Sequence, residues 1–231
     1  MNDLIIISCL FGVKFNRVHN SPDKENSYFF TNNKNLKNEI ISKGWNYVFV
    51  DKELSSNYII SSLQAKYIKF LKFLDDFPKF KTAKKILYID HKLVTDYKTL
   101  NEVKSLIKNN QDKSVIIRHD RKKKTNIFQE VNAAKKQERY AKNMSSTISF
   151  IRRVTATKEY SENVRICATG FLIYINRKEI MDLINNIYDK CMEHQQPECQ
   201  IYWGIFSQKY KSKIKEIGWY DIKNIYSKVL K

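Results

Sequence analysis

The chain has 231 residues, of which 42% are hydrophobic and 13% aromatic, which suits one domain with a sizeable core. Only five glycines and three prolines occur, so long linkers and low-complexity segments are excluded. The formal net charge of +18 favours an anionic partner: a phosphorylated small molecule, an acidic membrane surface or nucleic acid. We therefore expect a single domain over residues 1–231.

The cellular location is predicted from the length of the apolar segments and from the residues that precede the first of them. No run reaches the ~18 apolar residues that cross a bilayer. The apolar segment Leu4–Phe11 has no basic residue before it, so it is predicted to be a buried strand and not a signal peptide. We expect a cytoplasmic protein, or for a viral protein one in the host cytoplasm or the virion. Reduced, buried thiols are expected at all four cysteines: Cys9, Cys167, Cys191 and Cys199.

The first half of the chain alternates short apolar runs with amphipathic ones. Apolar residues at helical spacing predict helices over Ile60–Leu74 and Leu100–Ile107. Strands are predicted from the short apolar runs at Leu4–Cys9, Tyr28–Thr31, Tyr47–Val50, Ile86–Ile89 and Ser114–Ile117.

The second half is more basic. A partly exposed helix is predicted over Phe128–Ala141, a buried strand over Phe171–Ile175, and a helix from about Arg177 to His194. The tail Ile201–Lys231 mixes aromatic and basic residues without a decisive period. Strands that alternate with helices predict an α/β fold, with a mostly parallel central sheet flanked by helices.

Ligands of such sheets bind at the carboxyl ends of the strands, and polar residues follow several of the predicted strands. Asp90 comes directly after the strand Ile86–Ile89, where a carboxylate can hold a divalent cation on a diphosphate. The alternative is that Asp90 only begins a turn. Lys92 occupies the place of the second acid of an Asp-x-Asp pair and can itself neutralise phosphate, so the need for Mn²⁺ or Mg²⁺ stays open. His91 is a weaker candidate ligand. His194, in the spacing Cys191-x2-His194-x4-Cys199, is another, although the paired CxxC of a zinc site is missing.

The order of several short motifs resembles the TOD/MUCI-type glycosyltransferase-like domain family, whose members have a GT-A-like architecture. The similarity runs from about residue 4 to residue 205. The matching segments are Phe11-Gly12, Phe30-Thr31-Asn32, Gly44-Trp45, Lys66-Tyr67-Ile68-Lys69, Ile89-Asp90-His91-Lys92, His119-Asp120-Arg121, Phe128-Gln129-Glu130 and Cys199-Gln200. Three positions depart from the family pattern: Lys66 replaces Arg, His91 replaces Gly, and Cys199 replaces an Asp, beside which Glu198 stands.

This resemblance implies sugar transfer from a nucleotide sugar to a hydroxyl of a glycan or glycoconjugate. The expected catalytic residues are Asp90, Glu198 and Glu130. The expected donor-binding residues are Phe11, Gly12, Asn32, Lys66, Lys69, Lys92, His119 and Arg121. The residues expected at the acceptor or the sugar are Thr169, Gly170 and Gln200.

Two other functions stay open. The basic stretch Arg118–Lys142 could bind nucleic acid, but it lacks the interleaved aromatic residues of an RNA-binding sheet and any helix-turn-helix pattern, which makes nucleic acid the weaker partner. The loss of Asp at Cys199 also fits an inactive sugar-binding domain. The sequence does not indicate an oligomeric state.

Overall fold

The structure is a computed structural model that describes residues 3–13, 18–222 and 226–227. Seven strands form one mixed sheet in the order β3-β2-β1-β4-β7-β6-β8. Their bounds are β1 Leu4–Cys9, β2 Ser27–Thr31, β3 Asn46–Phe49, β4 Lys85–Ile89, β6 Val115–His119, β7 Cys167–Tyr174 and β8 Ile214–Ile217. The predicted α/β fold with a mostly parallel sheet is confirmed. β7 is the exception, because it is antiparallel to both β4 and β6.

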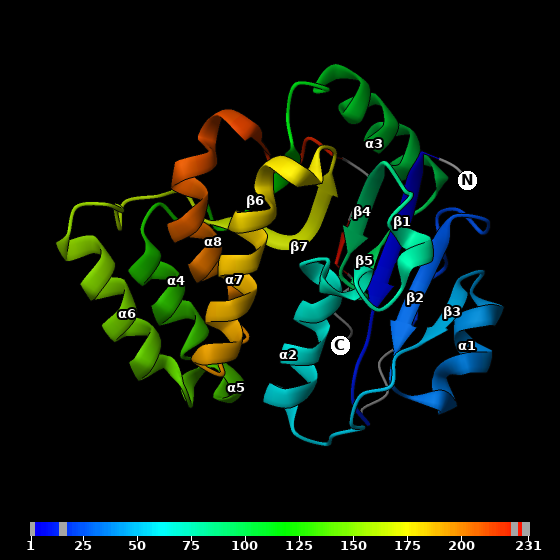
Figure 1. The fold of residues 1–231 in the computed structure, drawn as a ribbon, viewed down its shortest axis with the longest axis horizontal. Helices are drawn as coiled ribbons and strands as arrows, with labels where there is room; N and C mark the ends of the chain where they lie inside the picture. Colours follow the sequence, from blue (N-terminus) through cyan, green and yellow to red (C-terminus); the bar gives the residue numbers. More distant parts are fainter. Residues whose placement is uncertain (1–2, 14–17, 223–225, 228–231) are drawn as a thin grey trace.

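Helices cover both faces of this sheet (Figure 1). The helices are α1 Lys37–Ser42, α2 Tyr58–Lys69, α3 Tyr97–Asn109, α4 Ile127–Ala134, α5 Glu138–Ala141, α6 Met144–Ala156, α7 Met181–Glu193 and α8 Cys199–Phe206. A small second ladder joins β5 Leu93–Val94 to β9 Tyr226–Ser227. No helix in the described ranges is both long enough and apolar enough to cross a membrane.

Side chains alternate between two cores, as the period of two in a strand requires. Ile5 and Ile7 of β1 face the larger core, into which α2, α4, α7 and α8 pack. Ile6, between them, faces the smaller core with Ile40 of α1 and Val103 of α3. Strands buried on both faces read as continuous apolar runs, which is why the sequence located them well.

Three predicted helices differ from those in the structure. The helix expected over Ile60–Leu74 ends at Lys69, because Leu71 adopts a left-handed conformation (φ 59°) before a 3-10 turn over Lys72–Leu74. The helix expected over Phe128–Ala141 is wrong as one element, since it divides into α4 and α5 around Lys135–Gln137. The helix expected from Arg177 begins with a 3-10 turn over Arg177–Ile180 and continues as α7.

Candidate active site

A pocket opens where β1 and β4 end side by side. These strands are parallel and in register, Ile7 opposite Tyr88, so the residues that follow them meet at one edge of the sheet. Its lining includes Cys9, Phe11, Lys66, Lys69, Tyr88, Asp90, His91, Lys92, Arg139 and Tyr140. The structure therefore brings together six residues that the sequence singled out: Phe11, Lys66, Lys69, Asp90, His91 and Lys92.

The position of Asp90 is fixed by backbone contacts. Its N–H donates to the carbonyl oxygen of Gly170 on β7, 2.8 Å away. Its half-buried carboxylate accepts the N–H of Lys92 at 3.2 Å, and Oδ1 lies 3.4 Å from Nδ1 of His91. Burial acts to raise the pKa of Asp90, but the positive charges of His91, Lys69 and Lys92 outweigh it and lower this pKa to about 2. Asp90 is thus a carboxylate at every physiological pH.

Two lysines of α2 point into the pocket from positions three apart, which share one face of a helix. Lys66 is 8% exposed and Lys69 is 4% exposed. Nζ of Lys69 lies 3.5 Å from Oγ1 of Thr169 and 5.1 Å from the centroid of the Tyr88 ring. Thr169 and Gly170, predicted at the sugar, therefore lie on β7 directly beside Lys69 and Asp90.

The cations of the pocket lack a close acidic partner in the part of the chain that the structure describes. Within the described residues, no carboxylate lies within 4.0 Å of a side-chain nitrogen of Lys66, Lys69, Lys92 or Arg139. Buried charges in proteins are nearly always paired, because an unpaired buried charge loses its hydration without compensation. Desolvation lowers the pKa of the more exposed Lys92 although Asp90 opposes it, whereas at Lys66 nearby groups that include Glu198 outweigh desolvation and raise the pKa. A pocket of this kind is suited to an anionic ligand.

Gly12 and Asn32 lie behind the pocket and shape the loop after β1. Gly12 has φ 94°, and a Cβ there would lie 2.3 Å from Oγ of Ser61. Oδ1 of Asn32 accepts the N–H of Gly12 at 2.9 Å, while Nδ2 donates to the carbonyl of Glu53. These two predicted donor residues thus hold the loop that carries Phe11.

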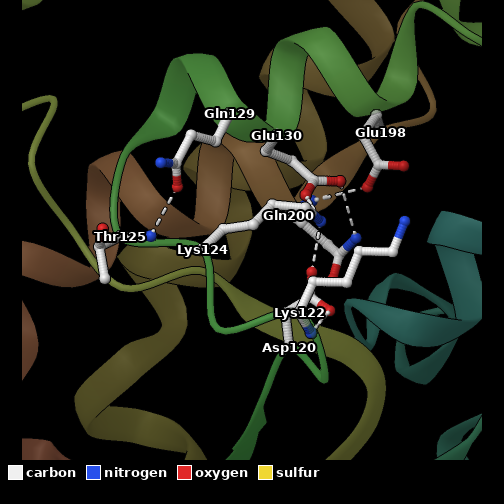
Figure 2. A network of polar contacts seen from close by, with 8 residues as sticks. All are labelled: Asp120, Lys122, Lys124, Thr125, Gln129, Glu130, Glu198 and Gln200. Carbon is white, nitrogen blue, oxygen red and sulfur yellow. Dashed lines mark hydrogen bonds and ion pairs between the residues drawn. The ribbon is translucent and has the colours of Figure 1, made fainter.

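A polar network joins α4 to the start of α8 (Figure 2). The buried carboxylate of Glu130 pairs with Lys124 and accepts Nε2 of Gln200 at 3.2 Å. Glu198 caps α8, its Oε1 accepting the N–H of Gln200 at 3.3 Å. Burial, with the nearby Glu198 charge, raises the pKa of Glu130 even though Lys124 opposes the shift. Glu198 also acts electrostatically on Lys66 and Tyr140, so the network adjoins the pocket.

The whole fold is similar to several solved structures. Mouse xyloside xylosyltransferase 1, in its apo form, is similar over 92% of this chain and 84% of its own, with a TM-score of 0.52 and 8% identity. The fold is of the GT-A type. A glycosyltransferase involved in the glycosylation of the major capsid of PBCV-1 aligns over 99% of this chain and 94% of its own (TM-score 0.48, 11% identity). Core-mannan synthase A from Aspergillus fumigatus, in a form with Mn and GDP, covers 96% and 74% (TM-score 0.40, 13% identity). No family model and no curated protein sequence matches the chain.

His119, Arg121 and His194, also predicted at the site, neither line the pocket nor belong to the loop, the strand or the polar network described beside it. His119 ends β6, with its Nε2 2.9 Å from Oε2 of Glu216. Arg121 is exposed in the turn that follows. His194 ends α7, where its Nδ1 lies 2.8 Å from the Tyr202 hydroxyl and its ring packs on Phe150.

The prediction of free, buried thiols at all four cysteines is confirmed. His119, Cys167 and Glu216 form the one group of three metal-type ligands in the described ranges, each ligand atom within 4.8 Å of the others. Nη1 of Arg165 lies 3.4 Å from Nδ1 of His119, and this positive charge disfavours a cation. The hydrogen bonds of His119 with Glu216 and Arg165 already explain why these side chains lie together. Cys191, His194 and Cys199 do not form such a group.

Sequence reasoning missed Arg139 and Tyr140, which close the pocket from α5. They lie in a basic stretch with no period or motif to separate them from surface residues, so only the packing of α5 against α2 shows their role. Another hollow lies at the opposite edge of the sheet, beside Leu4 and Lys85. Ligands of parallel sheets bind at the carboxyl ends of the strands, so the Asp90 pocket is the better candidate.

Proposed function

We propose that this protein is a glycosyltransferase that moves a sugar from a nucleotide-sugar donor to a hydroxyl of a glycan or glycoconjugate. One observation supports this most: the buried Lys66 and Lys69 form no salt bridge with any described residue and line a pocket at the carboxyl ends of β1 and β4. That edge of a GT-A fold suits a diphosphate. We further propose that residues 1–231 act as one domain and that it is related to the TOD/MUCI-type family, whose motif order it resembles.

The donor side of the proposed site uses the lysines and Asp90. When the bond between the sugar and the diphosphate breaks, negative charge grows on the leaving phosphate, and ammonium groups held beside it stabilise that charge. Lys66, Lys69 and Lys92 supply them. The ionised carboxylate of Asp90 accepts hydrogen bonds from hydroxyls of the donor sugar or ribose. Phe11 lines the pocket, while Thr169 and Gly170 contact its residues Lys69 and Asp90 from β7.

The acceptor side is assigned to Glu198, Glu130 and Gln200. Only Oε1 of Glu198 is used in capping α8, so Oε2 is left to take the proton of an acceptor hydroxyl. The hydroxyl oxygen then forms the new bond to the anomeric carbon as the nucleoside diphosphate leaves. Glu130 orients Gln200. Cys199, which stands where the resembled family has Asp, is buried with Sγ 3.1 Å from Oγ1 of Thr169.

A thermal-shift screen tests this function. Nucleoside diphosphates and nucleotide sugars with different bases and sugars are added to the protein, and the midpoint of thermal unfolding is measured. We expect nucleotides with one particular base to raise this midpoint, because a ligand that binds only the native state stabilises that state. Products of transfer are then assayed with that donor. Stabilisation without any transfer or donor hydrolysis supports an inactive sugar-binding domain, and stabilisation by no nucleotide contradicts the proposal.

The nucleic-acid alternative loses support from how the basic stretch folds. Arg118 is buried with its guanidinium 3.8 Å from the Trp219 ring, Lys124 is paired inside the network, and Arg139 lines the pocket. The stretch is therefore not one continuous basic face. Nucleic-acid binding should be weak and steeply salt-dependent, with a log–log slope of about −0.9 per duplex phosphate contacted. Tight duplex binding at physiological salt, with no nucleotide-sugar binding, would favour the alternative.

A further inference from the structure

The pocket has few ligands for a divalent cation. Asp90 is the only carboxylate among its described lining residues. Nδ1 of His91 lies 3.4 Å from Oδ1 of Asp90, but no third His, Cys, Asp or Glu of the described residues completes a group with this pair. The Cys9 thiol also lines the pocket, but its soft sulfur is a poor ligand for Mn²⁺ and Mg²⁺, which prefer oxygen atoms. The donor set does not fit a resident Mn²⁺ or Mg²⁺.

The pocket has many positive charges of its own. Lys66, Lys69, Lys92 and Arg139 carry four positive charges and Asp90 carries one negative charge, which leaves a formal +3. His91 adds little, because burial lowers its pKa. A nucleoside diphosphate carries about −3 at neutral pH, since the second pKa of a terminal phosphate is near 6. The fixed cations therefore match the leaving group, and a divalent ion would bring the pocket to +5 before any ligand bound.

We infer that the pocket binds the diphosphate without a divalent cation, and that Lys66, Lys69, Lys92 and Arg139 do the work of the metal. The inference rests on the proposed function, because it concerns the same pocket. Ammonium and guanidinium groups make charge-assisted hydrogen bonds to phosphate oxygens, which are about twice as strong as neutral ones. They stay in place through the reaction, since Lys66 and Lys69 are anchored on α2.

In the protein without a ligand, burial of these positive charges destabilises the fold. Among the residues that the structure describes, the hydrogen-bond partners of the Lys69 ammonium are a hydroxyl at 3.5 Å and a sulfur at 3.9 Å. Desolvation of the ammonium is therefore poorly compensated until an anion binds. Replacing Lys69 by the apolar Met, of similar length, should remove this cost and the binding together.

Calorimetric titration of the whole chain tests the inference. The probes are inorganic pyrophosphate and the nucleoside diphosphate selected by the thermal-shift screen, each in EDTA and in Mn²⁺ or Mg²⁺. We expect both to bind in EDTA, with dissociation constants that metal changes by less than about threefold, because the fixed cations already neutralise the ligand. Binding that appears only with metal overturns the inference and leaves the proposed function intact. Binding in neither condition contradicts both.

Two lysine variants identify the groups responsible. Lys69→Met and Lys66→Met should each weaken pyrophosphate binding about tenfold or more in EDTA, the loss expected for one charged phosphate contact. Lys72→Met is the matched control, because Nζ of Lys72 lies over the Tyr188 ring, outside the pocket. The midpoint of thermal unfolding of Lys69→Met without ligand should be no lower than that of the wild type. Unchanged pyrophosphate affinity in both pocket variants overturns the inference, and the wild-type metal comparison decides it even if a variant fails to fold.

Discussion

The N–H of Asp90 donates to the carbonyl oxygen of Gly170 at 2.8 Å, so the end of β4 is tied to the strand that runs against it. A Cβ at Gly170 would lie 3.4 Å from Cβ of Asp90, in ordinary van der Waals contact, so the two residues are direct neighbours across the strands. The main-chain bond places Asp90 against β7, and its carboxylate adds only a local contact with the N–H of Lys92. Its side chain can be changed while the backbone around the pocket is kept.

Asp90→Asn should abolish sugar transfer while the protein stays folded. The amide keeps the shape of the side chain but loses the charge that faces Lys69, Lys92 and the donor hydroxyls. The measurements are product formation and far-UV circular dichroism. Asp51→Asn is the control, because Asp51 also follows a strand but is exposed and lies outside the pocket. Wild-type turnover in Asp90→Asn would show that Asp90 only begins a turn.

The same variant should reveal a pH-dependent contribution to stability. The pKa of Asp90 is lowered from 3.8 to about 2 on folding, so its carboxylate stabilises the native state above pH 3.8. That contribution, up to ~2 kcal/mol, is lost as the pH falls through about 2. Urea unfolding should find Asp90→Asn less stable than wild type at neutral pH, with a smaller difference near pH 3. An equal difference at both pH values would contradict the lowered pKa.

Lys92→Ala should weaken binding of the nucleoside diphosphate much more than binding of the nucleoside. The ammonium acts on the phosphates, so its removal should cost about tenfold for the diphosphate and little for the nucleoside. Fluorescence or calorimetric titration measures both constants. Lys98→Ala on the exposed side of α3 is the control. Equal losses for the two ligands would argue against contact with phosphate.

Glu198→Gln should lower kcat at least ~100-fold and leave donor affinity nearly unchanged, as expected for loss of a general base. The Gln side chain still offers an oxygen to the N–H of Gln200, so the cap of α8 survives. Glu193→Gln, on the exposed end of α7, is the matched control.

Glu130→Gln should instead destabilise the fold, because Lys124 then keeps only Asp120 as an acidic partner among the described residues. If kcat falls only in Glu130→Gln, the general base is Glu130 and not Glu198.

The strands β1, β2, β4, β6 and β7 were predictable because they are short and largely buried on both faces. Three features were not. The Ser- and Thr-rich sequence of α6 hides a helical stripe at Met144, Thr147 and Ile151. The direction of β7 depends on its long-range pairing with β4 and β6, which periodicity cannot show. β8 has two exposed residues between Ile214 and Ile217 and is recognisable as a strand only beside β6.

The candidate site was predictable where a residue directly follows a strand or occupies the inner face of α2. Asp90, Lys92, Lys66 and Lys69 are of this kind, and the structure places them in one pocket. His119 is the last residue of β6, and in the sheet β7 and β4 separate β6 from β1. His119 therefore lies away from the pocket. The order of strands in the sheet decides this separation, and local sequence does not encode that order.

The edge position of β8 has a consequence for how the chain folds as it is made. β6 pairs with β8 from Val115 opposite Ile214, 99 positions later, whereas the neighbours β3, β2, β1 and β4 are complete by Ile89. On the ribosome the first four strands can associate early, while β6 keeps an unpaired edge until the last strand of the sheet emerges. We expect stalled nascent chains to yield a protease-resistant amino-terminal fragment first, and those that lack residues 214–217 to aggregate through β6.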